Sequence, residues 1–370
     1  MPSVNHAGWR FDYAVPDLAN GGLVVSNARF HGRLVLVEGS QPFSLTVYHD
    51  ITNVGDHLET VYKDGLGNGA CSSGGSPYRA IVPSAPNGAA DALEPRHYAT
   101  NGGPWDPLSS PGGAVRVELH EPDLTEPARA VVWAKFEMHH YQFIHRWEFN
   151  AGGTIDVRVG LGGKLNDAVT DPRMLNHIHQ FYFRLRFNLD ALGDNAAQRF
   201  DHAGFIPGQD QWTDITHEQV EIGSPNGRTK WRVRSGSPKP NGRYRSYELI
   251  PGSDGAVDGE FSSGDLWVLN FDSAETGADV ECDDSILSRS YVDPAATIDG
   301  SEIVFWHCLR HHHEARQFGE EQAVVPHEFI GFSLEPRDFL DDTLRRLYTT
   351  DPPSPIGPPP RPDPRGPDPS

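Results

Sequence analysis

Residues 175–190, LNHIHQFYFRLRFNLD, have the alternating pattern of a β-strand and place two histidines one residue apart near its beginning. Because strand side chains alternate between two faces, His177 and His179 share one face with apolar side chains. These are Phe181, Phe183 and Leu185. Two imidazoles about 6–7 Å apart along a strand can converge on one metal ion. The alternative is a pair of core histidines that hydrogen bonds satisfy.

Strand-like segments recur along the chain and predict an all-β fold, a large antiparallel β sandwich with few short helices. Short apolar or alternating runs are separated by turn residues, among 38 glycines and 31 prolines. The runs are 21–27, 33–38, 130–138, 154–160, 230–235, 265–271 and 302–309. Two segments are predicted to be helical: residues 336–348, which are amphipathic, and residues 191–200, where the pattern is weaker.

The chain is predicted to form a single β-sandwich domain, residues 1–350, followed by a proline-rich tail, residues 351–370. The tail has ten prolines in twenty residues, so it cannot pair into a sheet and should be disordered. Residues 66–112 are rich in Gly, Ser, Pro and Asn, which is typical of a long functional or disordered loop.

Charge and composition exclude several classes of partner. The 370 residues include 51 acidic and 31 basic side chains, a net charge of −20, which disfavours nucleic acid and attracts small cations. Three cysteines without a CxxC pair indicate neither a disulfide framework nor a zinc ribbon. No signal peptide and no apolar run of about 20 residues is evident, so no membrane association and a cytoplasmic location are expected.

Two further histidine groups could complete a metal site. The segment WHCLRHHHEAR, residues 306–316, contains His307, His311, His312 and His313. Three imidazoles suit copper, zinc, iron or nickel, so ligand type alone does not choose the metal.

The other group, MHHYQFIHRW, spans residues 138–147 and contains His139, His140, Tyr141 and His145. Tyr141 would share a strand face with His145 and with the aromatic side chains that alternate along the segment. These are Phe143, Trp147 and Phe149. A tyrosine beside a metal is chemically suggestive, and an aromatic core stripe is the alternative.

These segments together resemble the copper amine oxidase family. HIHQFYFRLRFNLD resembles the family's HxH strand with its Arg-Leu pair. VFWHCLRHHHEAR and PHEFIGFSLEPRDFL resemble its C-terminal stretch, in which the third copper histidine follows a tryptophan by seven residues. Counted from Trp306, that histidine is His313. The resemblance covers most of residues 8–345 and implies the family's catalytic β sandwich without its small N-terminal domains.

The resemblance implies roles for three more residues. WEFNAGGTIDVRVGLGG, residues 147–163, is similar to the strand–turn–strand after the family's cofactor tyrosine, which puts Tyr141 at that position. Tyr48 stands where the family has a tyrosine that contacts the quinone. Asp64 is the counterpart of the catalytic base, which must be partly desolvated; a surface turn aspartate is the alternative.

The implied activity is the oxidation of a small primary amine by dioxygen, with copper and with topaquinone derived from Tyr141, in a homodimer. The family flanks this tyrosine with asparagine and an acid, whereas this chain has His140-Tyr141-Gln142. His140 could be an additional metal or proton-relay group. Two alternatives therefore stay open: a copper oxidase or oxygenase with unmodified Tyr141, and a non-catalytic metal-binding relative.

Overall fold

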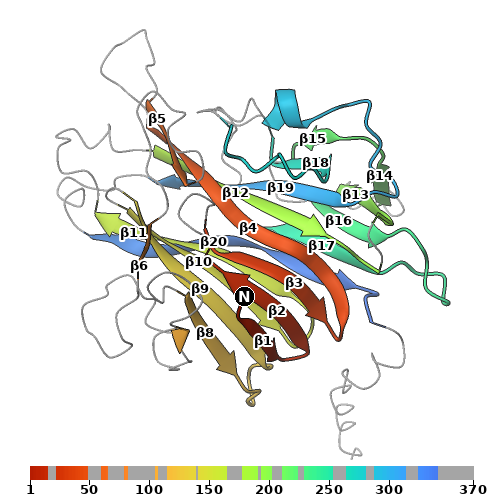
Figure 1. Ribbon diagram of the computed structural model, residues 1–370, viewed down its shortest axis with the longest axis horizontal. Helices are drawn as coiled ribbons and strands as arrows, with labels where there is room; N and C mark the ends of the chain where they lie inside the picture. The colour runs from red at the N-terminus through yellow and green to blue at the C-terminus, as the bar shows by residue number, and fades with distance from the viewer. Residues whose placement is uncertain are drawn as a thin grey trace, which may run out of the picture.

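The chain folds as two antiparallel β-sheets that pack face to face, as the computed structural model shows (Figure 1). The predicted β sandwich is therefore confirmed. The structure describes residues 1–15, 22–48, 60–65, 79–81, 105–106, 115–138, 141–164, 177–190, 193–201, 211–223, 229–252, 264–280, 287–313 and 324–340.

The first sheet has nine strands. Two of its central strands carry the histidine pair of residues 177 and 179 and the histidines of residues 307–313. In spatial order they are β1 (Ser3–His6), β2 (Trp9–Ala14), β3 (Val24–Phe30), β4 (Arg33–Tyr48), β12 (His177–Phe187), β19 (Ile303–His313), β18 (Leu266–Asn270) and β15 (Gln219–Glu221), with β5 (Thr60–Gly65) paired to β4.

The second sheet has eleven strands. Their order is β14 (Gln211–Ile215), β13 (Asn195–Asp201), β16 (Thr229–Ser235), β17 (Ser246–Pro251), β20 (Val324–Arg337), β11 (Ile155–Lys164), β10 (Tyr141–Asn150), β9 (Arg129–Met138), β8 (Val115–His120) and β7 (Trp105–Asp106), with β6 (Arg79–Ile81) paired to β9. A short π-helix, η4 (Leu287–Tyr291), follows β18.

The main core fills the space between the sheets and is rich in aromatic side chains. Phe183 of β12 meets Phe332 of β20 edge to face, with ring centroids 5.0 Å apart. Phe181 meets Phe143 of β10 at the same distance. Each fully buried side chain of this size contributes about 1.5–3 kcal/mol to stability. The core therefore holds β12 firmly against the opposing sheet.

β12 is also covered on its outer face, which explains why aromatic residues occupy both sets of alternating positions. Tyr182 stacks on Phe43 of β4 at 4.7 Å and belongs to a second buried cluster with Trp267 and Trp306. Leu287 and Tyr291 of η4 belong to the same cluster. β12 is thus a strand buried on both faces, and its histidines lie on the face toward the main core.

Both predicted helices are wrong where the structure describes them. Residues 195–200 of the predicted helix 191–200 lie in β13, which is paired on both sides by β14 and β16. Cross-strand pairing here overrides the helix propensity of the two alanines in this segment. Residues 336–337 of the predicted helix 336–348 continue β20 opposite β17, residues 338–340 are not helical, and residues 341–348 lie outside the described residues.

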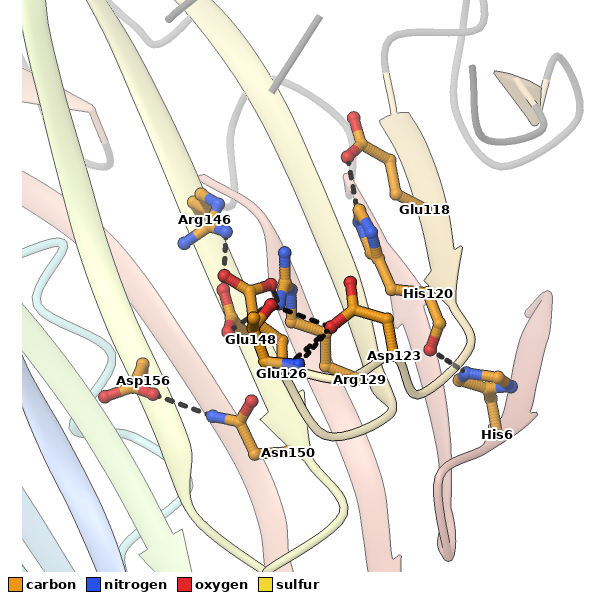
Figure 2. Close-up of polar contacts among 11 residues, drawn as sticks. His6, Glu118, His120, Asp123, Glu126, Arg129, Arg146, Glu148, Asn150 and Asp156 are labelled. Carbon is orange, nitrogen blue, oxygen red and sulfur yellow. Dashed lines mark hydrogen bonds and ion pairs between the residues drawn. The ribbon is translucent and has the colours of Figure 1, made fainter. Parts of the chain in front are cut away.

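Near the end of β10 away from Tyr141, polar side chains connect neighbouring strands of the second sheet, and one contact joins the first sheet to the second (Figure 2). Asn150 of β10 donates a hydrogen bond from Nδ2 to Asp156 of β11 at 2.8 Å. His6 of β1 donates a hydrogen bond from Nε2 to the backbone carbonyl of His120 at 2.9 Å. These contacts are structural and lie at the opposite end of β10 from the candidate site.

Within the described residues, no helix is long and apolar enough to cross a membrane. The predicted loop 66–112 falls mostly outside the description, although β6 and β7 lie in it. The predicted tail, residues 351–370, and Cys71 and Cys282 also lie outside it.

Candidate metal centre and cofactor site

His177 and His179 begin β12 and are both fully buried. Their Nε2 atoms are 2.9 Å apart, and their ring planes are nearly perpendicular, at 87°. Two nitrogens that bind one metal ion at about 2.0–2.1 Å and at right angles lie about 2.9 Å from each other. The pair therefore fits two adjacent ligands of one metal ion, and copper accepts imidazoles in this arrangement.

The ring of His179 is held by polar and aromatic neighbours. Thr46 Oγ1 on β4 is 3.2 Å from His179 Nδ1. The ring stacks on Phe181 at 5.8 Å, and it meets Phe143 of the opposing sheet edge to face at 5.5 Å. The contact at Nδ1 leaves Nε2 for the contact with His177 or for a metal.

The strand register shows which predicted site residues share a face with the pair. Directly paired residues of antiparallel strands lie on the same face of a sheet. His177 is paired with position 48 of β4 on one side and with position 313 of β19 on the other. The sheet therefore brings together Tyr48, His177 and His313, three residues that are far apart in the sequence, in one row.

The side chain of the predicted third ligand, His313, lies outside the description, so the structure gives only its backbone position in this row. His311 is paired with His179 and is buried, at 8% exposure. Among the described side chains, no three His, Cys, Asp or Glu residues gather closely enough to hold a metal ion. His311 therefore does not complete the ligand set with His177 and His179.

The other two histidines of this segment lie elsewhere. His312 is exposed. His307 is buried beside Phe332, six residues before position 313, and its Nδ1 donates to the backbone carbonyl of Asp265 at 3.0 Å. Burial lowers the pKa of His307 to about 4, so this side chain is a neutral core residue at ordinary pH.

The strand register places Asp64 on the face of the sheet that carries the histidine pair. It stands in the next row on that face after the row of His179. It is paired with Ser44 of β4, and Ser44 is paired with Phe181 of β12. Adjacent strands are about 4.7–4.9 Å apart, so the backbone of Asp64 is about 10 Å from β12. Its side chain lies outside the description, as does that of Tyr48.

Tyr141 begins β10, and its position is level with the histidine pair. Two residues further on, Phe143 contacts His179, and alternate strand residues share a face. Trp147 lies on Gly39, because a Cβ atom on Gly39 would be 2.5 Å from its ring, and Gly39 is paired with Leu185. β10 and β12 therefore run in the same direction, and position 141 lies toward the beginning of β12.

Of the residues around Tyr141, His145 has a described side chain and its nearest neighbours do not. The side chains of Tyr141 and Gln142, and all of His139 and His140, lie outside the description. His145 is buried, packs beside Phe136 with ring centroids 4.4 Å apart, and accepts a hydrogen bond at Nδ1 from the backbone N–H of Leu23 at 3.4 Å. Burial lowers its pKa to about 3, so His145 is a packing residue of the core.

Thr46 was not predicted from the sequence. Its hydroxyl reaches His179 only because β4 pairs with β12 in the register that sets Thr46 opposite His179. The alternation of Ser44, Thr46 and Tyr48 within FSLTVY is the one sequence signal that could have placed Thr46 on the site's face.

Comparison with known proteins identifies the family. Residues 124–350, more than half of the chain, match the family described as copper amine oxidase, enzyme domain. The chain belongs to the copper amine oxidase family. The resemblance inferred from the HxH strand and the C-terminal histidine run is thereby confirmed.

Curated relatives match at low identity. Amine oxidase [copper-containing] alpha 2, peroxisomal, of Arabidopsis thaliana is 22% identical over an alignment of 295 residues, and the match covers 64% of this chain and 41% of the relative. Primary amine oxidase 2 of the same plant is 23% identical over an alignment of 269 residues, and the match covers 63% of this chain and 39% of the relative. The chain thus spans about two fifths of the length of these relatives.

Solved structures share the fold at low sequence identity. A copper-containing benzylamine oxidase from Hansenula polymorpha matches with a TM-score of 0.66 and 16% identity, over 92% of this chain and 60% of its own. Pichia pastoris lysyl oxidase matches with a TM-score of 0.61 and 14% identity, over 91% of this chain and 52% of its own. Both comparisons support the sandwich architecture, and neither identifies a substrate for this chain.

Proposed function

We propose that this protein is a copper-dependent amine oxidase that deaminates a small primary amine. In the balanced reaction the amine loses two electrons and two protons, dioxygen takes up both and becomes hydrogen peroxide, and water replaces the nitrogen, which leaves as ammonia. The observation that carries the proposal is the buried pair of Nε2 atoms 2.9 Å apart, in a member of the copper amine oxidase family.

His177 and His179 would hold copper through Nε2, and His313 would supply the third imidazole. The shared row of positions 177 and 313 supports this assignment. Copper with dioxygen would convert Tyr141 to topaquinone, and that quinone would accept the two electrons of the amine. The contact of Phe143 with His179 supports the choice of Tyr141, since positions 141 and 143 share a face of β10.

Asp64 would accept the α-proton of the amine at its carboxylate, and Tyr48 would orient the cofactor. Their positions on the histidine face of the first sheet support both roles. A carboxylate base works near neutral pH only when it is partly desolvated. Phe143 and Phe181, both fully buried, would exclude water from one side of the site. The net charge of −20 would attract a cationic amine over the whole surface.

The test is to load metal-free protein with Cu(II) in the presence of dioxygen and then to add phenylhydrazine. We expect a visible hydrazone band and, in a sample taken before phenylhydrazine is added, a peptide containing Tyr141 that has gained two oxygen atoms and lost two hydrogens. The matched control is Tyr141→Phe, which keeps the histidines and should give no band. A colourless product with unmodified Tyr141 by mass spectrometry would show the quinone proposal to be wrong.

A second candidate keeps copper but leaves Tyr141 unmodified. It is favoured by His140 and Gln142, which stand where the family has an asparagine and an acid. Copper-dependent oxygen consumption without the hydrazone band would support it. Absence of any oxygen consumption with a panel of amines would instead favour a non-catalytic metal-binding relative.

A further inference from the structure

Thr46 is a buried polar side chain in β4, paired with His179 in the neighbouring strand. Its exposure is 3%, and its Oγ1 lies 3.2 Å from His179 Nδ1. A buried hydroxyl is costly unless it is hydrogen-bonded. A neutral imidazole has one nitrogen that donates and one that accepts, so a bond at Nδ1 constrains the state of Nε2.

We propose that Thr46 is a positioning residue of the copper site. Its Oγ1 accepts a hydrogen bond from the Nδ1–H of His179 and thereby keeps the proton off Nε2, where the lone pair must face the metal. This inference rests on the proposed function, because it assigns Thr46 a role at that site. It adds a hydroxyl that sets the tautomer of one metal ligand before the metal arrives.

The aromatic walls around His179 cannot do this alone. Phe181 stacks on the ring and Phe143 meets it edge to face, which fixes the plane of the ring. Two orientations that differ by a 180° flip have nearly the same shape, because ring C–H and N groups are similar in size. Thr46 distinguishes them, since only one orientation sets Nδ1 against its hydroxyl and directs Nε2 toward His177.

The experiment compares four variants. Thr46→Val keeps the shape of the side chain and removes the hydroxyl, Thr46→Ser keeps the hydroxyl, and Thr46→Ala is a second deletion in case valine does not fold. The matched control is Thr229→Val on β16, which removes another buried hydroxyl, one bonded to Asp201 at 2.9 Å. Urea midpoints establish that each variant is folded.

The first measurement is made on the metal-free protein by long-range ¹⁵N–¹H NMR of the histidine rings. We expect His179 to carry its proton on Nδ1 in the unsubstituted protein, in Thr46→Ser and in Thr229→Val. Without the hydroxyl, Thr46→Val and Thr46→Ala should give a mixture of tautomers. An unprotonated Nδ1 in the unsubstituted protein, or an unchanged tautomer in both deletions, overturns the inference.

The second measurement is the affinity for Cu(II), by competition with a chelator. Loss of a group that orients a metal ligand typically weakens binding about 10–100-fold, so we expect a loss of this size in Thr46→Val and Thr46→Ala, rescue by serine, and no change in Thr229→Val. Equal affinities in all variants overturn the inference. If the unsubstituted protein does not bind Cu(II), the proposed function falls, while the NMR result still decides what Thr46 does to His179.

Discussion

The histidines at the beginning of β12 and those in the middle of the sandwich are equally buried but differently used. His177 and His179 direct their Nε2 atoms at each other. His145 and His307 instead pair one nitrogen with the backbone and pack against phenylalanine rings. Burial alone therefore does not mark a metal ligand. What separates the two pairs is convergence, because two imidazole nitrogens facing one point make a site.

The largest expected effect separates the pairs by metal affinity. His179→Ala should weaken Cu(II) binding by more than about 100-fold, since a directly bound nitrogen is lost and even orienting groups account for 10–100-fold. His145→Ala should leave the affinity within about threefold. Chelator competition measures both values. Comparable losses in the two variants would remove the distinction between site and core histidines.

The stability of the metal-free protein should also depend on His145. His145→Ala removes a buried ring that packs on Phe136 and accepts the N–H of Leu23, so it should lower the free energy of unfolding by about 2–5 kcal/mol. Urea unfolding of the metal-free protein measures the change. A loss below about 1 kcal/mol would mean that His145 is not the packing residue described above.

The close approach of Gly22 to His145 offers a sharper test of the same packing. A Cβ atom at position 22 would lie 2.2 Å from the His145 ring. Gly22→Ala should therefore cost about 1–3 kcal/mol from overpacking. In the His145→Ala background the cost should fall but not vanish, because the clashing ring is gone while the backbone carbonyl of Gln41 still lies 2.9 Å from the added Cβ atom. Additive losses in the double variant would contradict the contact.

Acid should destabilise the protein through its core histidines. Burial lowers the pKa of His307 from its ordinary 6.5 to about 4, so the unfolded chain takes up a proton first. The free energy of unfolding is therefore not reduced by this histidine above pH 6.5. As the pH falls from 6.5 toward 4, it decreases by about 1.4 kcal/mol per pH unit.

The matched variant for this pH effect is His307→Leu, which cannot take up the proton. The carbonyl of Asp265 keeps its other hydrogen bond, from the N–H of Cys308, at 3.0 Å. Urea midpoints at pH 7, 6 and 5 should fall less steeply in the variant than in the unsubstituted metal-free protein. Parallel slopes would show that His307 does not titrate in this window.

Much of the fold followed from the sequence because strand alternation is local. The pattern of residues 175–190 predicted which face carries His177 and His179, and that face lies toward the main core. Pairing between distant strands could not be read in the same way. The alanines at 196 and 197 favoured a helix, yet β14 and β16 hold them in β13. Thr46 was missed for the same reason, since its partner is 133 residues away.

The smallest effect is expected at His312, which stands between two histidines of the site's face but is itself exposed. Side chains alternate along β19, so position 312 faces away from positions 311 and 313. His312→Ala should change neither the Cu(II) affinity nor the free energy of unfolding by more than about 0.5 kcal/mol. His313→Ala is the natural comparison, because the proposed ligand set predicts a loss of copper there. If His312→Ala weakened copper binding as much as His313→Ala, the register of β19 would have to shift by one residue, which would turn the neighbouring Trp306 and Cys308 toward the main core.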